Sequence, residues 1–446
     1  MKRELKTTMH CLFSAALFLF FLAGNSQAGI DGITGTTFAL TVKTGRVNTP
    51  DGASLLLWGY ANGNDPAQYP GPTLIVNQGE TITITLSNEL TVTGTGPAPN
   101  VSMVFPGHQA TSSLSNPGVP GILANEARPG DSVTYTFTAT HPGTYLYYSG
   151  TDPALQVEMG LLGAIIVRPS DGNNYAYNHP DTQFDREYLF LLSEMDPRIH
   201  EVVELDGAEG LAATDYLSNP FPVVWFINGR NAPDTLDQPG TGSLPNQPYN
   251  SAPLVHPGER LLMRVIGGGK DLHPFHHHGN HARIIARDGR LLESIPGAGP
   301  DLSHEVYTIQ SVPGETVDAI FQWTGKGLNW DIYGTPEAGP QFVHDCTDGD
   351  ADDYDDTTYE YCPDHGKKFP VVLPDNLDLA FGGFYSGSPY FGNLGSLPPG
   401  EGGLNPFGGY AFMWHSHTEK ELTNFDIFPG GLMTMLVIVP QGAPIP

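Results

Sequence analysis

The stretch TLIVNQGETITITLSNEL, residues 73–90, decides the fold of this chain. Apolar and polar residues alternate on both sides of Gly79, and a period of two places alternate side chains on one face of a β-strand. Three later segments share this strand character: SVTYTFTAT (132–140), GTYLYYSG (143–150) and GLLGAIIVRP (160–169). Together the four segments predict a first unit of short strands.

The same pattern returns after a polar linker at 170–185 and breaks down between about 333 and 409, a segment rich in Gly, Pro and Asp. The strand segments of this second unit are REYLFLLSEMD (186–196), ERLLMRVIG (259–267), HARIIARDGRLLE (281–293), TVDAIFQWTG (316–325), YAFMWHSH (410–417) and GGLMTMLVIVP (430–440). No segment shows the apolar period of an amphipathic helix. We therefore predict two sandwiches of antiparallel strands, at 29–170 and 185–446, the second with an irregular insertion at about 333–409.

The composition of the chain bears on its partners. It has 48 acidic and 20 basic residues, a net charge of −28. Such a surface repels the phosphates of nucleic acids and anionic lipids, and it attracts cations, metal ions included. We expect no nucleic acid partner.

The N-terminal segment predicts export. Lys2, Arg3 and Lys6 precede an apolar run from Cys11 to Gly24, and small residues lead to a cleavage point after residue 28. The run is shorter than the roughly 20 residues of a membrane span. We expect a signal peptide at 1–28, a periplasmic or extracellular protein, and no membrane span once it is removed.

Five of the 16 histidines lie in DLHPFHHHGNH, residues 271–281. On a strand, His276 and His278 project from one face while His277 points away. HSH at His415 to His417 repeats the spacing. Imidazole is a ligand for copper, zinc, iron and nickel, so the two segments predict a transition-metal site.

At these motifs the chain resembles the multicopper oxidases. YPGPTLIVNQGETITITLSN (69–88) is similar to the start of their first domain, HPFHHHG (273–279) to their HxxHxH motif, and HSH with PGGLMTMLVIV (429–439) to their last motif. The resemblance covers most of residues 35–335 and 409–440. It implies two cupredoxin-like Greek-key β-sandwich domains and bound copper. His276, His278, His415 and His417 would be ligands of a multinuclear copper cluster, and His273 a type 1 copper ligand.

The chain also departs from the family pattern. The first family motif would fall at Val104 to Gly107 and the second near Tyr148, and neither place carries its histidines. His108, one residue past the first motif, is an alternative ligand. The cysteine and a later histidine of the last motif are Ser416 and Glu421. We therefore expect a reduced, mono- or dinuclear copper site and no type 1 centre in its usual place.

Two cysteines remain after the predicted signal peptide, Cys346 and Cys362. In an oxidising compartment we expect them to form a disulfide. Cys362 with His365 also resembles the C-x-x-H loop of small cupredoxins, which leaves a displaced copper site as an alternative. The acidic run between the cysteines, TDGDADDYDD (347–356), is similar to a calcium loop but lacks its glycine, so calcium is a weaker prediction.

Three functions remain open from the sequence. The protein is a copper-dependent oxidase acting with oxygen, a non-enzymatic copper-sequestering protein, or a structural scaffold of cupredoxin domains. Fold alone does not decide between them. Two-domain members of the family form trimers, so a homo-oligomer is a further expectation by analogy.

Overall fold

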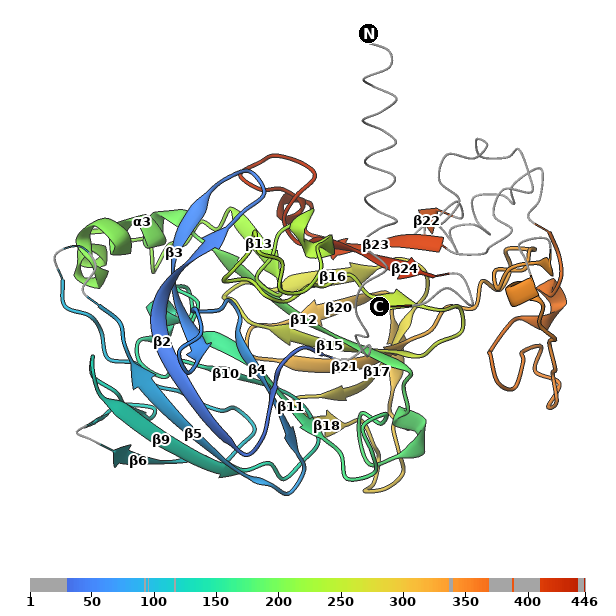
Figure 1. The fold of residues 1–446 in the computed structure, drawn as a ribbon, viewed down its shortest axis with the longest axis horizontal. Coiled ribbons are helices and arrows are strands. Elements are labelled where there is room, and N and C mark those ends of the chain that lie inside the picture. The colour runs from blue at the N-terminus through green and yellow to red at the C-terminus, as the bar shows by residue number, and fades with distance from the viewer. Residues whose placement is uncertain are drawn as a thin grey trace, which may run out of the picture.

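The structure is a computed structural model, and it describes residues 30–91, 94, 96–115, 118–336, 340–368, 387–388, 410–439 and 445. Its regular structure is mostly β-strand, arranged in two halves (Figure 1). The predicted signal peptide, residues 1–28, lies outside the described residues. Among those described, no helix is long and apolar enough to span a membrane.

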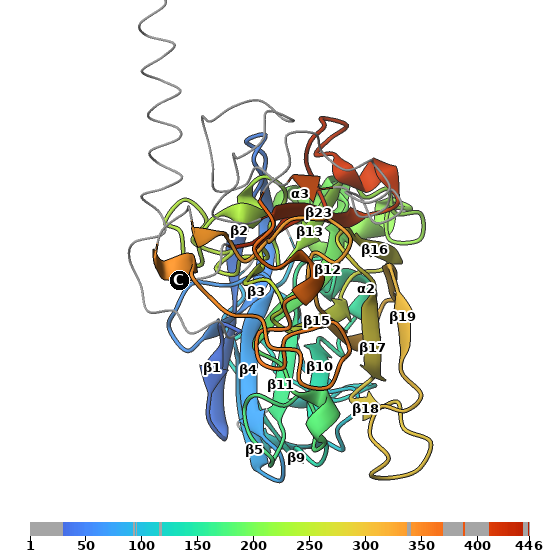
Figure 2. The ribbon, with the colours of Figure 1, turned by 90° about the vertical axis from the view of Figure 1, so that its right-hand side faces the viewer.

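The first half is a sandwich of a four-stranded and a five-stranded sheet. Figure 2 shows the four-stranded sheet, in the order β1-β4-β11-β10, side by side. The other sheet has the order β3-β2-β5-β9-β6, and β7 pairs with β8. The bounds are β1 Ile33–Thr34, β2 Thr37–Asn48, β3 Ser54–Asn62, β4 Gly71–Asn77, β5 Thr81–Asn88, β6 Thr111–Ser115, β7 Val119–Pro120, β8 Asn125–Glu126, β9 Ser132–Thr138, β10 Gly143–Tyr148 and β11 Leu162–Arg168.

The stretch 73–90 forms strands on both sides of Gly79, as predicted, but in different sheets: β4 belongs to one and β5 to the other. Gly79 has φ of 85°, a conformation that glycine adopts without a steric penalty. Along β5 every second residue is buried, including Ile82, Ile84 and Leu86. The alternation therefore marks a strand with one face in the core.

The second half is a sandwich of a seven-stranded and a six-stranded sheet. The first has the order β13-β12-β15-β21-β17-β18 with β19 beside β17, and the second β14-β24-β23-β16-β20 with β22 beside β23. The bounds are β12 Arg186–Met195, β13 Val224–Ile227, β14 Leu254–Val255, β15 Leu261–Gly267, β16 His273–His277, β17 Ala282–Arg287, β18 Arg290–Leu291, β19 His304–Val306, β20 Thr308–Ser311, β21 Thr316–Phe321, β22 Gly387–Ser388, β23 Tyr410–Ser416 and β24 Met433–Ile438.

Two sequence expectations about the elements are wrong. The strands are not all antiparallel: β2 pairs with β5, β4 with β11, and β12 with β15 in parallel. Successive strands such as β4 and β5 alternate between the sheets, so neighbours within a sheet can run the same way. A helix also exists, α3 at Pro197–Asp206, which begins at the N-cap Asp196 and buries Ile199 and Val203. Its apolar face is too short to give a clear period in the sequence.

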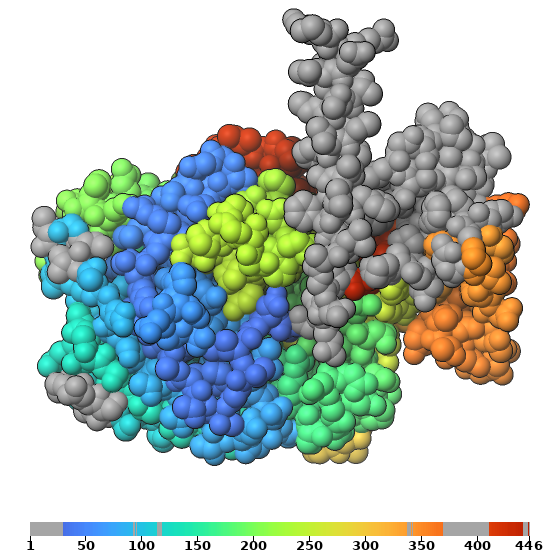
Figure 3. Space-filling model, viewed as in Figure 1, coloured from blue at the N-terminus to red at the C-terminus, as the bar shows by residue number. Residues whose placement is uncertain are grey.

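The remaining helical segments are short. They are α2 Pro153–Gln156, η2 Pro180–Thr182, η3 Ala208–Ala213, η4 Asp234–Leu236, η6 Pro340–Phe342, η7 Cys362–Asp364 and η8 Glu419–Leu422. Of the predicted insertion, the structure describes 333–336, 340–368 and 387–388. Residues 340–368 form an irregular lobe at one edge of the molecule (Figures 1 and 3).

The two halves pack closely against each other. One buried apolar cluster contains Leu57, Tyr69 and Leu146 from the first half and Leu191, Phe226 and Ile266 from the second. The Tyr69 hydroxyl donates to Ser193 Oγ at 2.6 Å within it. The segment after β13 also lies over the first half, where Gln247 Nε2 donates to the Asn48 carbonyl at 2.9 Å (Figure 3, yellow-green on blue).

Candidate metal centre

Strands β16 and β23 bring the two histidine segments together. In their antiparallel pairing His276 lies opposite His415. Because side chains alternate along a strand, His278 and His417 project from the same face as this pair. Residues that are 139 positions apart in the chain therefore meet at one place.

The other face of these strands explains why the imidazoles point outward. Phe275 and Trp414 are fully buried there, with their ring centroids 6.2 Å apart. His277 is also turned to the core, where its Nε2 lies 3.1 Å from the Val306 carbonyl. Burial lowers the pKa of His277 to about 3, so this ring is neutral. The separation of His277 from its neighbours agrees with the alternation of the sequence.

The cluster itself is compact. Ligand nitrogens of His276, His278 and His415 all lie within 4.8 Å of one another. The Nε2 atoms of His278 and His415 are 3.3 Å apart. The ring centroid of His417 is 4.9 Å from that of His276. His276 and His415 are buried, whereas the side chain of His417 is 46% exposed, so the cluster opens to solvent on the His417 side.

Contacts on the far ring nitrogens orient two of the imidazoles. Nδ1 of His276 lies 2.9 Å from Thr308 Oγ1, and Nδ1 of His415 lies 2.6 Å from the Ser416 carbonyl. A carbonyl accepts only, so the proton of His415 is on Nδ1 and its Nε2 carries the lone pair. Such outer contacts are how proteins fix the tautomer of a metal-binding histidine.

Two rings of the cluster, those of His276 and His415, are held neutral. Burial, together with the neighbouring His278, His415 and His417, lowers the pKa of His276 to about 4. Burial also lowers the pKa of His415. A metal binds the neutral form of imidazole, so near pH 7 these nitrogens are available as ligands. The donor set therefore fits a transition-metal ion such as copper.

His273 is placed differently from the other predicted ligands. Its ring is fully buried, with Nδ1 2.9 Å from Glu421 Oε2 and Nε2 2.9 Å from Glu194 Oε2. Burial alone would lower its pKa, but the two carboxylates outweigh it and raise the pKa to about 9. Its role as a metal ligand stays a prediction. A metal at either nitrogen has to displace a carboxylate or bind together with it.

The positions compared with the first two family motifs lie in the first half, together with His108. Val104 and Tyr148, at the places compared with the first two family motifs, face each other in an isolated β-bridge. His108 stacks between Phe137 and Tyr145, with ring centroids 4.5 and 4.4 Å away. Burial lowers its pKa to about 4. Within the described part of the chain, it is not a member of the histidine cluster.

The structure also contains a group that our sequence analysis missed. Asp331, His344, Glu360 and His365 place ligand atoms within 4.8 Å of one another. Cys346 and Cys362 form a disulfide beside it. The signal in the sequence was the position of His344 and His365, two residues before one cysteine and three after the other. The C-x-x-H pattern favours His365 only as a copper ligand together with a Cys362 thiolate, and the disulfide removes that thiolate.

The acidic loop predicted for calcium is exposed. Asp348, Asp350 and Asp352 place carboxylate oxygens within 4.8 Å of one another. Asp348 accepts backbone hydrogen bonds from Asp352 and Asp353 at 3.0 and 3.1 Å. Calcium at this loop stays a prediction.

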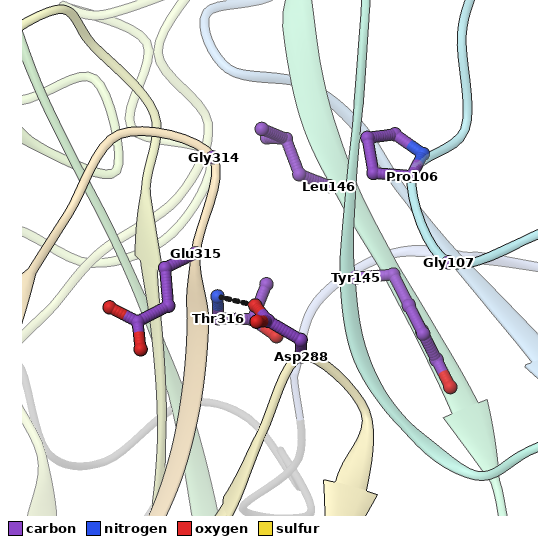
Figure 4. A pocket seen from close by; sticks show the side chains of 8 residues that line it. All are labelled: Pro106, Gly107, Tyr145, Leu146, Asp288, Gly314, Glu315 and Thr316. Atoms are coloured by element: carbon purple, nitrogen blue, oxygen red, sulfur yellow. Dashed lines mark hydrogen bonds between the residues drawn. The ribbon is translucent and has the colours of Figure 1, made fainter.

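A cavity of about 400 Å³ lies between the halves, and no member of the histidine cluster lines it. Figure 4 shows Tyr145 and Pro106 of the first half facing Asp288 and Thr316 of the second half. The backbone N–H of Thr316 donates to Asp288 Oδ1 at 3.0 Å. No predicted ligand lines it.

Comparison with known proteins gives the family. The family model described as multicopper oxidase matches residues 41–172, which span the strands of the first half from β2 to β11. The first half of the chain therefore matches the multicopper oxidase family. This confirms the resemblance drawn from the motifs and makes the protein a multicopper oxidase-like copper protein.

Two curated relatives illustrate the range of this family. Copper resistance protein A of Escherichia coli is 25% identical over 287 residues, which cover 58% of this chain and 42% of that protein. A probable nitrite reductase-hydroxylamine oxidoreductase fusion protein of Kuenenia stuttgartiensis is 26% identical over 328 residues, covering 71% of this chain and 32% of its own length. The chain therefore spans less than half the length of these relatives.

Solved structures confirm the fold. The blue copper oxidase of Nitrosomonas europaea superposes with a TM-score of 0.52 at 19% identity, covering 90% of this chain and 85% of that one. The multicopper oxidase mgLAC superposes with a TM-score of 0.51 at 17% identity, covering 92% of this chain and 87% of that one. The predicted pair of cupredoxin-like sandwiches is thus confirmed as a multicopper oxidase fold.

Proposed function

We propose that this protein binds copper through His276, His278, His415 and His417, in a mono- or dinuclear site. The observation that carries the proposal is the convergence of three imidazoles, with the Nε2 atoms of His278 and His415 3.3 Å apart. Two ligands on a tetrahedral ion with bonds of about 2.0 Å lie about 3.3 Å apart, so one ion fits between these nitrogens.

We further propose copper-dependent oxidoreductase activity on small organic molecules or metal ions. Copper would supply one-electron chemistry between Cu(I) and Cu(II). The protein would contribute rings oriented through Thr308 and the Ser416 carbonyl, and a wall of Phe275 and Trp414 that keeps water away from behind. The exposed side of His417 leaves an approach for a substrate.

The copper content of purified variants tests this site. His276→Ala with His278→Ala removes two of the three converging ligands, so the copper bound at saturation should fall to near zero. His304→Ala, an exposed histidine on β19, is the matched control and should leave it unchanged. Unchanged copper in the double variant, by elemental analysis and electron paramagnetic resonance, would falsify the assignment.

One observation favours a second candidate function, copper sequestration without turnover. The position of the family cysteine holds Ser416, and the only cysteines in the described part of the chain form the Cys346–Cys362 disulfide. A type 1 copper thiolate would be the usual electron entry of a multi-electron oxidase. Its place here is taken by the ion pairs of His273.

Oxygen consumption separates the two candidates. Copper-loaded protein that consumes oxygen with phenols, Fe(II) or Mn(II), in proportion to its copper content, supports an oxidoreductase. Tight copper binding without consumption supports sequestration. We also propose export through residues 1–28, which N-terminal sequencing of the mature protein tests, and a homo-oligomer, which light scattering tests.

A further inference from the structure

A second set of metal-binding side chains lies in the lobe formed by residues 340–368, on the other side of the second half from α3 (Figure 1). Asp331 comes from the segment after β21, and His344, Glu360 and His365 come from the lobe itself. The comparison with the family gives this set no role, because the matched residues end at 172.

The four side chains are spaced like ligands of one ion. His344 Nε2 lies 3.0 Å from Glu360 Oε2 and 3.6 Å from Asp331 Oδ2. His365 Nδ1 lies 2.8 Å from Glu360 Oε1 and 3.8 Å from Asp331 Oδ2. Tetrahedral zinc, with bonds of about 2.0–2.2 Å, holds neighbouring ligand atoms about 3.3–3.5 Å apart, in the middle of this range.

Both carboxylates are buried, and that of Glu360 has an oxygen without a hydrogen bond among the described residues. Glu360 and Asp331 are only 2% and 3% exposed. Glu360 Oε2 and His344 Nε2 are both buried and, among the described residues, neither has a hydrogen bond of acceptable geometry. Unsatisfied buried polar atoms are rare, and an ion that both atoms bind would satisfy them.

Outer contacts hold the ligands in place. Nδ1 of His344 donates to the Phe342 carbonyl at 2.8 Å, which leaves Nε2 as the ligand atom. The backbone N–H of Gly366 donates to Asp331 Oδ2 at 2.8 Å. The Cys346–Cys362 disulfide joins the chain next to His344 to the chain next to Glu360 and His365. The hydrogen bonds and the disulfide therefore fix the positions of the proposed ligands.

We propose that Asp331, His344, Glu360 and His365 form a closed structural site for one Zn²⁺ ion. Two neutral imidazoles and two carboxylates give a nitrogen and oxygen donor set whose charge of −2 balances the ion. Thiolates, which soft ions such as Cu(I) prefer, are absent from the set because both nearby cysteines are oxidised.

The ion would fasten the lobe to the second half. Asp331 lies in the segment that follows β21 of the sandwich, whereas the other three proposed ligands lie in the lobe. Otherwise the lobe is attached by hydrogen bonds such as Tyr333 Oη to the Thr358 carbonyl, at 2.8 Å, and Asp331 N–H to the Lys367 carbonyl, at 2.8 Å. Zinc binding is thus expected to stabilise the lobe locally.

Titration of demetallated protein with Zn²⁺ alone tests the proposal. The full chain carrying His276→Ala and His278→Ala is used as background, so that the histidine cluster does not take up the ion. We expect one equivalent of zinc to bind. Adding His344→Ala with His365→Ala should abolish that uptake, and Glu360→Gln, which keeps the size of the side chain, should weaken it ~100-fold.

Two controls keep the outcome decisive. Asp348→Asn with Asp352→Asn alters only the exposed acidic loop and should leave zinc uptake unchanged. His344→Ala with His365→Ala in the otherwise native chain should still load copper, which shows that the second half is folded. Equal zinc uptake with and without His344 and His365, or no uptake at micromolar Zn²⁺ by the background protein, overturns the proposal and leaves these residues an ion-pair network.

Discussion

Nδ1 of His273 lies 2.9 Å from a carboxylate oxygen of Glu421, where the family pattern has two ligands of a type 1 copper. The ring is also held by Glu194 at 2.9 Å, and all three side chains are buried. A buried charge that loses its partner is strongly destabilising. The relationship therefore leads to a prediction about stability as well as about metal content.

We predict that His273→Gln lowers the free energy of unfolding by about 3 kcal/mol, because it leaves Glu194 and Glu421 without their shared cation. Copper bound by the histidine cluster should not change, since the ring contacts carboxylates instead of the cluster. Urea unfolding and elemental analysis of the same preparation measure both. A loss of one copper per chain with unchanged stability would instead make His273 a metal ligand.

We predict that the more buried a proposed copper ligand is, the more its removal weakens copper binding. His415→Ala removes a buried ligand 3.3 Å from His278, whereas His417→Ala removes a side chain that is 46% exposed at the rim. We expect His415→Ala to weaken copper binding at least ~10-fold more than His417→Ala, because the buried ring is already ordered before the metal binds. Competition with a copper chelator measures the ratio, and equal effects would contradict it.

The hydroxyl of Thr308 supports His276 through its 2.9 Å contact with Nδ1. Thr308→Val keeps the shape of the side chain and removes this contact, so we expect copper binding to weaken ~10-fold or more, as for other outer contacts of metal-binding histidines. Gln310→Ala, two residues along β20, serves as the matched control and should have no effect on affinity. An unchanged affinity of Thr308→Val would remove this residue from the site.

Because His108 is buried, we predict that the free energy of unfolding falls at acidic pH. Its pKa is lowered to about 4 in the folded protein by burial, below the value of about 6.5 in an unfolded chain. The unfolded state therefore binds more protons between these values, and stability falls as the pH is lowered from 6.5 to 4. We expect His108→Phe, which can keep the stacking on Phe137 and Tyr145, to reduce that fall by about 2 kcal/mol. Urea unfolding at pH 6.5 and 4 measures it, with His304→Gln as the exposed control.

The disulfide of the lobe gives a further prediction. Cys346 and Cys362 close a loop with a sequence separation of 16, for which cross-linking stabilises the folded form by about 3 kcal/mol. Cys346→Ser with Cys362→Ser should therefore make the lobe susceptible to limited proteolysis and weaken zinc binding at His344 and Glu360. Copper binding at the histidine cluster should be unaffected. A lobe equally protected from protease in the variant would contradict this.

Local patterns in the sequence predicted much of the fold and the shared face of the clustered histidines. Alternation around Gly79 gave two strands, and alternation of His276 with His278 gave the shared face. The parallel strand pairs were missed because they depend on which sheet each strand joins, and no local pattern carries that information. The carboxylates around His273 were missed for the same reason, since Glu194 and Glu421 are far from it in the chain. Asp331 and its three partners likewise become neighbours only when the lobe folds back on the sandwich.

The register that places His276 opposite His415 has a consequence for the order of events in the cell. His415 lies on β23 and His417 follows that strand directly, so no partly synthesised chain that ends before residue 417 has all four proposed ligands. A slip of one residue between β16 and β23 would turn one pair of imidazoles into the core. Under the proposed function, metal loading therefore follows correct strand pairing, because a chain without this pairing lacks the assembled set of proposed ligands.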